Sequence, residues 1–194
     1  MSDTAAMAQD GGAEPLLLPW LEAEHVVLRE FRDTDLELIR EASTDPLIPL
    51  ITTVPVDFSE AAGLAFIRRQ QGRLASREGY AFIIATRADD RAIGAIGLWI
   101  RDIALGRAFL GYWLGPSARG RGAAAEALLV VSEWALDHLE IVRLELFVEK
   151  WNVASWRTAE KAGFIREGLL RRWELIGGEW KDMYVYSKVR ELPK

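Results

Sequence analysis

Two arginines and two glycines precede a run of helix-forming residues, in the order Arg119, Gly120, Arg121 and Gly122. The backbone N–H groups in the first turn of a helix have no partner within the helix, and the helix dipole favours an anion there. Glycines let a phosphate approach the backbone closely, and arginines add charge-assisted hydrogen bonds. The stretch therefore predicts a binding loop for a diphosphate-bearing ligand. The alternative is a solvated helix start with two surface arginines.

Length and composition limit the class of protein that carries this loop. The chain has 194 residues, of which 50% are hydrophobic, and this suits one ordinary domain with its own core. It contains no cysteine, which excludes disulfides, thiolate metal ligands and a cysteine nucleophile. We expect a flexible extension over residues 1–20 and a single domain over residues 21–194. We also expect a cytoplasmic location, because the sequence shows neither a signal-peptide pattern nor an apolar run of about 18 residues.

The net charge of the chain limits the classes of partner that we expect. The formal net charge is −5 at pH 7, and Asp3, Asp10 and Glu14 of the extension carry part of it. A nucleic-acid-binding domain normally shows a clear basic excess, so we expect no nucleic acid. We also expect no membrane partner and no metal site. A mildly acidic body suits a cationic acceptor such as an amine.

Hydrophobic periodicity and turn residues predict the elements that position the loop. A Thr34-x-x-Glu37 capping box opens a first helix, prolines at 46, 49 and 55 impose an extended loop, and Ser59 caps a second helix. Further helices run from the arginine–glycine stretch to about residue 139 and over 153–162, and Gly177-Gly178 closes a final hairpin. The order predicts an α+β domain with a mixed sheet. The predicted strands are His25–Leu28, Tyr80–Thr86, Ile93–Arg101, Arg107–Leu114, Arg143–Val148, Ile165–Ile176 and Glu179–Ser187.

Four ordered elements of the sequence resemble the GNAT acetyltransferase superfamily. Arg119-x-x-Gly122-x-Ala124 is similar to its acetyl-CoA pyrophosphate loop, and it follows GYWLGPSA at residues 111–118. LREFRDTD at 28–35, NVAS at 152–155 and EKAGF at 160–164 resemble the branch that contains the Rim-type N-acetyltransferases of ribosomal-protein N-termini. The resemblance covers roughly residues 21–190. It implies the GNAT acyl-CoA N-acyltransferase fold, with a mixed, mostly antiparallel seven-stranded sheet and about four helices.

The resemblance also implies where acetyl-CoA binds as a co-substrate. The arginine–glycine stretch corresponds to the loop that wraps the pyrophosphate. The backbone at Trp113 and Leu114 corresponds to the place where two strands part beside the pantetheine arm, and Asn152 corresponds to a residue beside the same arm. Asn152 is also a favoured N-cap for the helix that follows it. The implied cofactor-binding residues are Trp113, Leu114, Arg119, Gly120, Arg121, Gly122, Ala123, Ala124 and Asn152.

Direct acetyl transfer to an amine needs a base for the amine and a proton donor for the departing thiol. Many members of the superfamily use a helix tyrosine as the donor, but this sequence has Ala159 at that position. Ser155, which matches the Asn-x-x-Ser element, is the alternative donor, and Glu174 is the predicted base, acting directly or through a water. Ser155 could instead be an ordinary first-turn serine, and Glu174 an exposed residue paired with Arg172 or Lys181.

The free energy needed to deprotonate the acceptor amine at neutral pH favours one kind of acceptor. A lysine amine with a pKa of about 10.4 costs about 4 kcal/mol to deprotonate at neutral pH, whereas an α-amine costs roughly 0.5–1 kcal/mol. A site without an obvious strong base suits the α-amine, so the leading hypothesis is acetylation of a protein N-terminus, such as that of a ribosomal protein. A small amine (an antibiotic or a polyamine) and a non-catalytic acetyl-CoA-binding module are the alternatives. Trp99 is expected on the acceptor side, and the oligomeric state stays open, a homodimer included.

Overall fold

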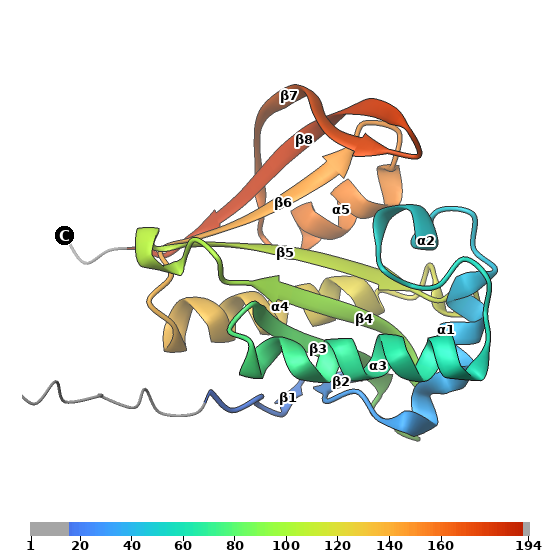
Figure 1. Cartoon of the computed structure of the whole chain (residues 1–194). Helices are drawn as coiled ribbons and strands as arrows, with labels where there is room; N and C mark the ends of the chain where they lie inside the picture. The colour runs from blue at the N-terminus through green and yellow to red at the C-terminus, as the bar shows by residue number, and fades with distance from the viewer. Residues whose placement is uncertain (1–15, 192–194) are drawn as a thin grey trace, which may run out of the picture.

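The computed structural model describes residues 16–191, so most of the extension predicted over residues 1–20 lies outside the described residues. Within them, eight strands form one sheet in the order β1-β2-β3-β4-β5-β6-β8-β7 (Figure 1). Neighbouring strands are antiparallel except β5 and β6, which are parallel. The strands are β1 Leu21–Glu22, β2 Val26–Arg29, β3 Gly79–Thr86, β4 Ala92–Trp99, β5 Arg107–Leu114, β6 Arg143–Glu149, β7 Ile165–Ile176 and β8 Glu179–Val189.

The predicted α+β fold with a mixed sheet is confirmed, with two differences in its elements. The sheet has eight strands rather than seven, because the two-residue strand β1 pairs with β2 and is too short to show a periodic pattern. The proline-rich loop contains the short helix α2, where Pro49 occupies the first turn and needs no N–H donor. The helices are α1 Leu36–Ser43, α2 Ile48–Ile51, α3 Glu60–Ala75, α4 Ala123–His138 and α5 Val153–Lys161.

Helices cover both faces of the sheet, and each face has its own core. Helices α1 and α3 lie on one face, and α4 and α5 lie on the other (Figure 1). In β3, Phe82 and Ile84 belong to the core beneath α4, whereas Ala81 and Ile83 belong to the core beneath α1 and α3. Successive side chains of a strand point to opposite faces, so a central strand between two helical layers must be apolar throughout. No helix within residues 16–191 is long and apolar enough to cross a membrane.

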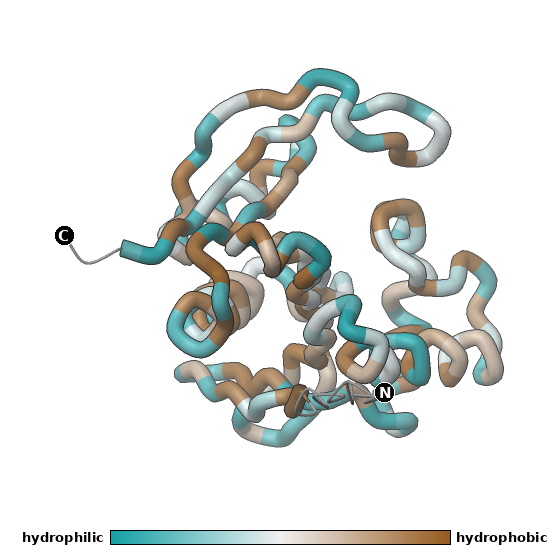
Figure 2. Tube along the Cα trace, turned by 60° about the vertical axis from the view of Figure 1, so that its left-hand side comes forward, coloured by the Kyte–Doolittle hydropathy of each residue, from teal (hydrophilic) through white to brown (hydrophobic). Residues whose placement is uncertain are grey.

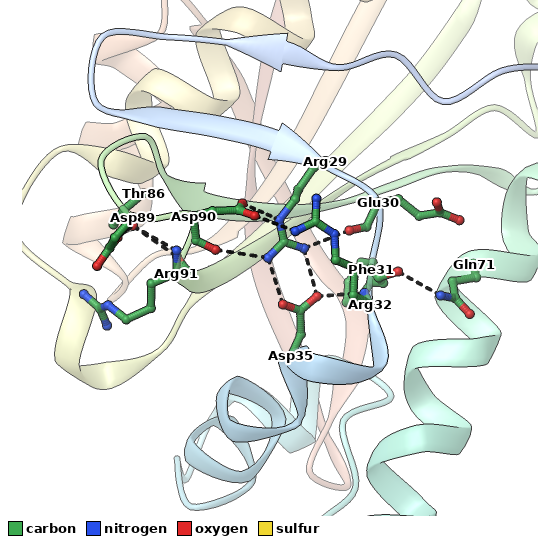
Figure 3. Close-up of polar contacts among 10 residues, drawn as sticks. All are labelled: Arg29, Glu30, Phe31, Arg32, Asp35, Gln71, Thr86, Asp89, Asp90 and Arg91. Carbon is green, nitrogen blue, oxygen red and sulfur yellow. Dashed lines mark hydrogen bonds and ion pairs between the residues drawn. The ribbon is translucent and has the colours of Figure 1, made fainter.

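A buried ion-pair network, rather than the predicted capping box at residues 34–37, fixes the start of α1; that prediction was wrong. A 3₁₀ turn at Asp33–Asp35 precedes the helix, and the Asp35 carboxylate accepts the backbone N–H of Arg32 at 2.8 Å. The same carboxylate receives two hydrogen bonds, of 2.9 and 3.0 Å, from the Arg29 guanidinium (Figure 3). Arg29 Nε also donates to Asp90 at 2.7 Å. The network joins β2, the β3–β4 turn and α1.

Two predicted helix caps and the predicted hairpin turn are confirmed. Ser59 Oγ accepts the backbone N–H of Ala62 at the start of α3. Asn152 Oδ1 accepts the backbone N–H of Ser155 at 3.1 Å at the start of α5. The residues at 177 and 178, which join β7 to β8, have φ angles of 58° and 83°. Glycine adopts such angles without strain, which is why this pair predicted the turn.

Candidate active site

Strands β5 and β6 lie side by side at one end and part at the other (Figure 1). Their pairing is limited to Arg107–Phe109 against Arg143–Glu145. Beyond these residues β5 has no sheet partner on that side, and a cavity of about 1050 Å³ is lined by both strands. An opening between two strands offers backbone N–H and C=O groups to an extended ligand. The parting that we expected near Trp113 is therefore present, although a cofactor contact there stays a prediction.

The arginine–glycine stretch leads directly into α4, beyond this cavity. Gly120 and Gly122 have φ angles of 79° and 85°, in the left-handed region that favours glycine. A Cβ at Gly120 would meet nothing within 4 Å, so the loop backbone is open to a ligand. A Cβ at Gly122 would lie 3.6 Å from Lys161 Nζ on α5. This second cation, in addition to the exposed Arg121, could not be predicted from the spacing of the loop residues, because it comes from the next helix.

Arg119, by contrast, is held by the protein. Its guanidinium forms an ion pair with Asp45 at 2.8 Å, and its Nε donates to the Leu114 carbonyl at 3.2 Å. The buried Asp45 also accepts the backbone N–H groups of Leu47 and Ile48, where α2 begins. Burial opposes ionisation of Asp45, but these backbone hydrogen bonds and the Arg119 guanidinium together lower its pKa. One ion pair thus joins the loop before α4 to α2.

Ser155 lies in the cavity wall in contact with a phenol. The Tyr112 hydroxyl lies 2.9 Å from Ser155 Oγ and donates to the Ser155 carbonyl at the same distance. Burial raises the pKa of Tyr112, although its hydrogen bonds with Ser155 and Thr158 act in the opposite sense. The phenol therefore keeps its proton at neutral pH. Ala159, at the position of the expected tyrosine, is fully buried in α5, so the phenol near Ser155 comes from β5 instead.

Two carboxylates line another part of the cavity. Glu149 ends β6, and Glu174 lies on β7 after a β-bulge in which Arg172 has a φ of 49°. Glu149 is buried and accepts a hydrogen bond from Trp151 Nε1 at 2.7 Å. Partial burial and the neighbouring Glu149 charge raise the pKa of Glu174. Glu174 is exposed, but its raised pKa makes it a better proton acceptor than a glutamate with an unshifted pKa.

The pairing proposed as an alternative for Glu174 does not occur. Lys181 forms its ion pair with Glu179 at the hairpin end, and the Arg172 backbone N–H donates to Asp182 at 2.9 Å. Within residues 16–191 no cation lies within 4 Å of the Glu174 carboxylate. The hydrogen-bonding capacity of this carboxylate is therefore available to a ligand or a water.

Helix α2 and the β7–β8 hairpin both border the cavity. A Cβ at Gly177 would lie 3.8 Å from Leu50 Cδ1, so the hairpin turn reaches α2. Figure 2 shows apolar segments on α2 and on the arm that faces it. Leu50, Ile51, Trp173 and Leu175 line the cavity and are also exposed. Exposed apolar side chains at the border of a cavity are typical of a site that receives a partner.

Trp99 lies flat against the sheet on the cavity floor. Its ring would lie 2.8 Å from a Cβ at Gly97 and 3.1 Å from a Cβ at Gly111, so both positions require the absence of a side chain. The ring stacks on Phe109 with centroids 5.0 Å apart, and the Arg73 guanidinium lies 5.2 Å from the Trp99 centroid. Phe147 and Trp173 form a second stack at 5.2 Å. The predicted aromatic residue therefore belongs to a larger aromatic surface.

The cavity brings together only some of the predicted site residues. It is lined by Trp99, Trp113, Asn152, Ser155 and Glu174, whereas the loop before α4 lies outside it. Two further residues of the site were not predicted from the sequence. Tyr112 lies inside an apolar strand, and Glu149 is a charged residue at a strand end, where such residues usually face solvent. The histidines contact other groups: His25 binds Glu126, and His138 lies against the Trp134 carbonyl.

Comparison with known proteins links this geometry to acetyl transfer. The sequence pattern of the acetyltransferase (GNAT) domain matches residues 25–165. A probable N-acetyltransferase, YjcK of Bacillus subtilis, is 41% identical over 123 residues, which are 62% of this chain and 67% of the relative. The uncharacterised N-acetyltransferase p20 of Bacillus licheniformis is 30% identical over 88% of this chain and 96% of its own length. A ribosomal-protein-serine acetyltransferase of Escherichia coli is 27% identical over 58% of this chain and 63% of its own length.

Solved structures share the fold. The microcin C7 self-immunity acetyltransferase MccE, solved in complex with acetyl-CoA and AMP, superposes with a TM-score of 0.74 at 23% identity. The match covers 87% of this chain and 94% of MccE. Mycobacterium smegmatis RimJ, in complex with a CoA-disulfide, superposes with a TM-score of 0.75 at 22% identity, over 91% of this chain and 88% of RimJ.

Proposed function

Because this chain belongs to the acetyltransferase (GNAT) domain family, we propose that it moves the acetyl group of acetyl-CoA to the N-terminal α-amine of a protein. N-acetyltransferase activity with acetyl-CoA as co-substrate follows from the family. The α-amine is the finer proposal. The observation that carries it is Glu174, which forms no ion pair within residues 16–191 and lies near Glu149 in a cavity bordered by exposed apolar side chains.

The strength of the base favours an α-amine acceptor. A carboxylate, even with a raised pKa, remains a much weaker base than a lysine amine. An α-amine with a pKa of about 7.8 is already partly neutral at physiological pH, so a weak base suffices. The ribosomal-protein-serine acetyltransferase of Escherichia coli is similar to this chain and supports a protein N-terminus as the acceptor.

The described side chains have one role each in the proposed reaction. The neutral amine attacks the thioester carbonyl carbon, and the C–S bond breaks as the C–N bond forms. Glu174 takes the proton that the amine loses, directly or through a water. Ser155 Oγ–H donates a hydrogen bond to the departing sulfur, which leaves as a thiolate and takes a proton from solvent, while Glu174 returns its proton to solvent. The Tyr112 hydroxyl, hydrogen-bonded to Ser155, holds the serine in place. No covalent enzyme intermediate is needed.

We place the pyrophosphate of acetyl-CoA at the loop Arg119–Ala124 and its pantetheine arm between β5 and β6, beside Trp113, Leu114 and Asn152. The open backbone at Gly120 and the two unpaired cations Arg121 and Lys161 within the described chain support this placement. The reach of the domain over residues 21–194, the cytoplasmic location and a homodimer stay predictions.

Exchange of Arg121 for Gln is expected to weaken acetyl-CoA binding by about 10- to 100-fold, because a charge-assisted hydrogen bond contributes about 1.5–3 kcal/mol. Arg121 is exposed, so the fold should be unaffected. Isothermal titration calorimetry gives the dissociation constant. Arg68→Gln, an exposed site on α3, is the matched control. Equal affinity in both variants would argue against the predicted phosphate loop.

Exchange of Glu149 for Gln is expected to lower the pKa of Glu174, because it removes the like charge that helps to raise it. The carboxyl carbon of Glu174 can be followed by NMR during a pH titration of the wild type and the variant. Burial, the larger cause, is unchanged, so the pKa should remain above the usual glutamate value. An unchanged pKa would show that the two carboxylates do not interact.

The acceptor is tested by mapping the product. A peptide with a free N-terminal serine and one internal lysine offers an α-amine and an ε-amine to the same enzyme. Mass spectrometric fragmentation after incubation with acetyl-CoA should locate the acetyl group at the N-terminus. Acetylation of the lysine alone would overturn the choice of an α-amine.

A further inference from the structure

One end of the cavity carries hydrogen-bond donors without carboxylate partners. Arg73 on α3 and Arg101 after β4 lie over the faces of the stacked pair Trp99 and Phe109, at 5.2 and 5.6 Å from the ring centroids. Arg107, at the start of β5, lines the same end. Within residues 16–191 none of these three arginines forms an ion pair within 4 Å. Burial lowers the pKa of Arg73, as expected for a cation that has lost water without gaining a carboxylate.

A buried amide at this end also lacks a partner. Gln70 lies one turn before Arg73 on α3, lines the cavity and is only 7% exposed. Its Nε2 is the one buried side-chain nitrogen or oxygen within residues 16–191 that has no hydrogen bond. A buried donor left unsatisfied costs about 1–3 kcal/mol, so proteins rarely retain one without a use. An oxygen of a bound ligand would satisfy it.

The carboxylates near this end are either engaged or more distant. Glu145 lines the cavity but is paired with Arg143 at 2.8 Å. Asp102 lines the cavity and Glu78 influences the pKa of Arg73, yet neither carboxylate comes within 4 Å of an arginine in the described chain. The positive charge at this end is therefore available to a ligand.

The two ends of the cavity have opposite character. Phe109 is the sheet partner of Glu145, and Glu149 lies four residues further along β6. At about 3.3 Å per residue, the acidic end lies about 13 Å from the level of the aromatic pair. An extended peptide covers that distance in about four residues. The cavity can therefore bind an amine at one end and an anion at the other only when both belong to an acceptor of that length.

We infer that the cavity end formed by Gln70, Arg73, Arg101 and the Trp99–Phe109 pair binds an acidic side chain at position 3 or 4 of the acceptor, counted from the residue that carries the amine as position 1. The inference rests on the proposed function, because it takes the acceptor to be a protein N-terminus. Guanidinium groups bind carboxylates through paired hydrogen bonds, and the Gln70 amide adds a neutral donor. The preferred substrates are therefore N-termini with an aspartate or glutamate near the start.

Matched peptides test the inference. Each has a free N-terminal serine and one glutamate at position 2, 3 or 4, and its counterpart has glutamine there. For the wild type, kcat/KM should be about 10-fold or more higher for glutamate at position 3 or 4 than for glutamine, since a charge-assisted hydrogen bond is worth that factor. Arg73→Gln should bring the ratio close to 1, whereas Arg68→Gln, an exposed site on the same helix, should preserve it.

Charge reversal gives a second readout that loss of folding cannot imitate. Arg73→Glu should prefer a peptide with lysine at position 3 or 4 over the glutamate peptide. Equal kcat/KM for glutamate and glutamine peptides in the wild type would overturn the inference and leave the proposed function intact. Turnover of small amines with no acetylation of any peptide would overturn the proposed function, and the inference with it.

Discussion

Replacement of Glu174 by Gln is expected to lower kcat by about 10²–10⁴-fold, the range over which general bases contribute to catalysis. The amide is nearly isosteric with the carboxylate but cannot accept a proton at neutral pH. Glu174 forms no ion pair within residues 16–191, so its exchange should leave the fold intact. Steady-state kinetics with a serine-terminated peptide measures the loss, and calorimetry should show that acetyl-CoA still binds with its original affinity.

The matched control is Glu179→Gln, on the same hairpin but at its exposed end, where the residue pairs with Lys181. An exposed ion pair contributes little, so this variant should keep its kcat. Comparable rates for Glu174→Gln and the wild type would remove Glu174 from the reaction. Proton transfer from the amine would then have to reach another group, and Glu149 would be the first to examine.

Replacement of Asp35 by Ala is expected to lower the free energy of unfolding by about 3 kcal/mol or more, because it leaves the buried Arg29 without its main partner. Arg29 is 3% exposed and Asp35 is 4% exposed. Arg29 would keep hydrogen bonds to the carboxylate and the backbone carbonyl of Asp90, but the Asp90 side chain is 44% exposed and shared with Arg32. Urea denaturation followed by circular dichroism measures the change.

Asp33→Ala is the matched control, since Asp33 lies in the same 3₁₀ turn and is exposed. It should change the free energy of unfolding by about 0.5 kcal/mol or less. Under conditions where the Asp35 variant remains folded, its kcat should match that of the wild type, because the network lies outside the cavity lining. A stability equal to that of the Asp33 variant would contradict the structural role given to this ion pair.

Local signals in the sequence predicted the elements that turn residues and periodicity define. Gly177-Gly178, the Ser59 cap and the strand Arg107–Leu114 all occur where they were expected. The spacing around Gly120 and Gly122 predicted a loop before a helix, and both residues have the left-handed φ angles that only glycine adopts easily. Such features depend on a few neighbouring residues, so one sequence suffices to recognise them.

Features that depend on contacts between distant segments were not predicted. The Arg119–Asp45 ion pair joins residues on different elements, and it ties to α2 a side chain that was expected to face the ligand. Tyr112 lies in an apolar strand, and only the fold brings its hydroxyl to Ser155. The predicted capping box at residues 34–37 does not form, because Thr34 lies inside the 3₁₀ turn that the Asp35 carboxylate and the buried Arg29 hold in place. Local patterns carry no information on such pairings.

Acetyl transfer from acetyl-CoA to the α-amine of a protein is the reaction that we propose. The most direct test measures thiol release from acetyl-CoA by the purified full chain. The acceptors are peptides with free Ser, Ala or Thr N-termini, their N-acetylated counterparts, polyamines and aminoglycosides. We predict release with the free peptides and none above background with the blocked ones. Release with polyamines or aminoglycosides, and none with any free peptide, would contradict the claim.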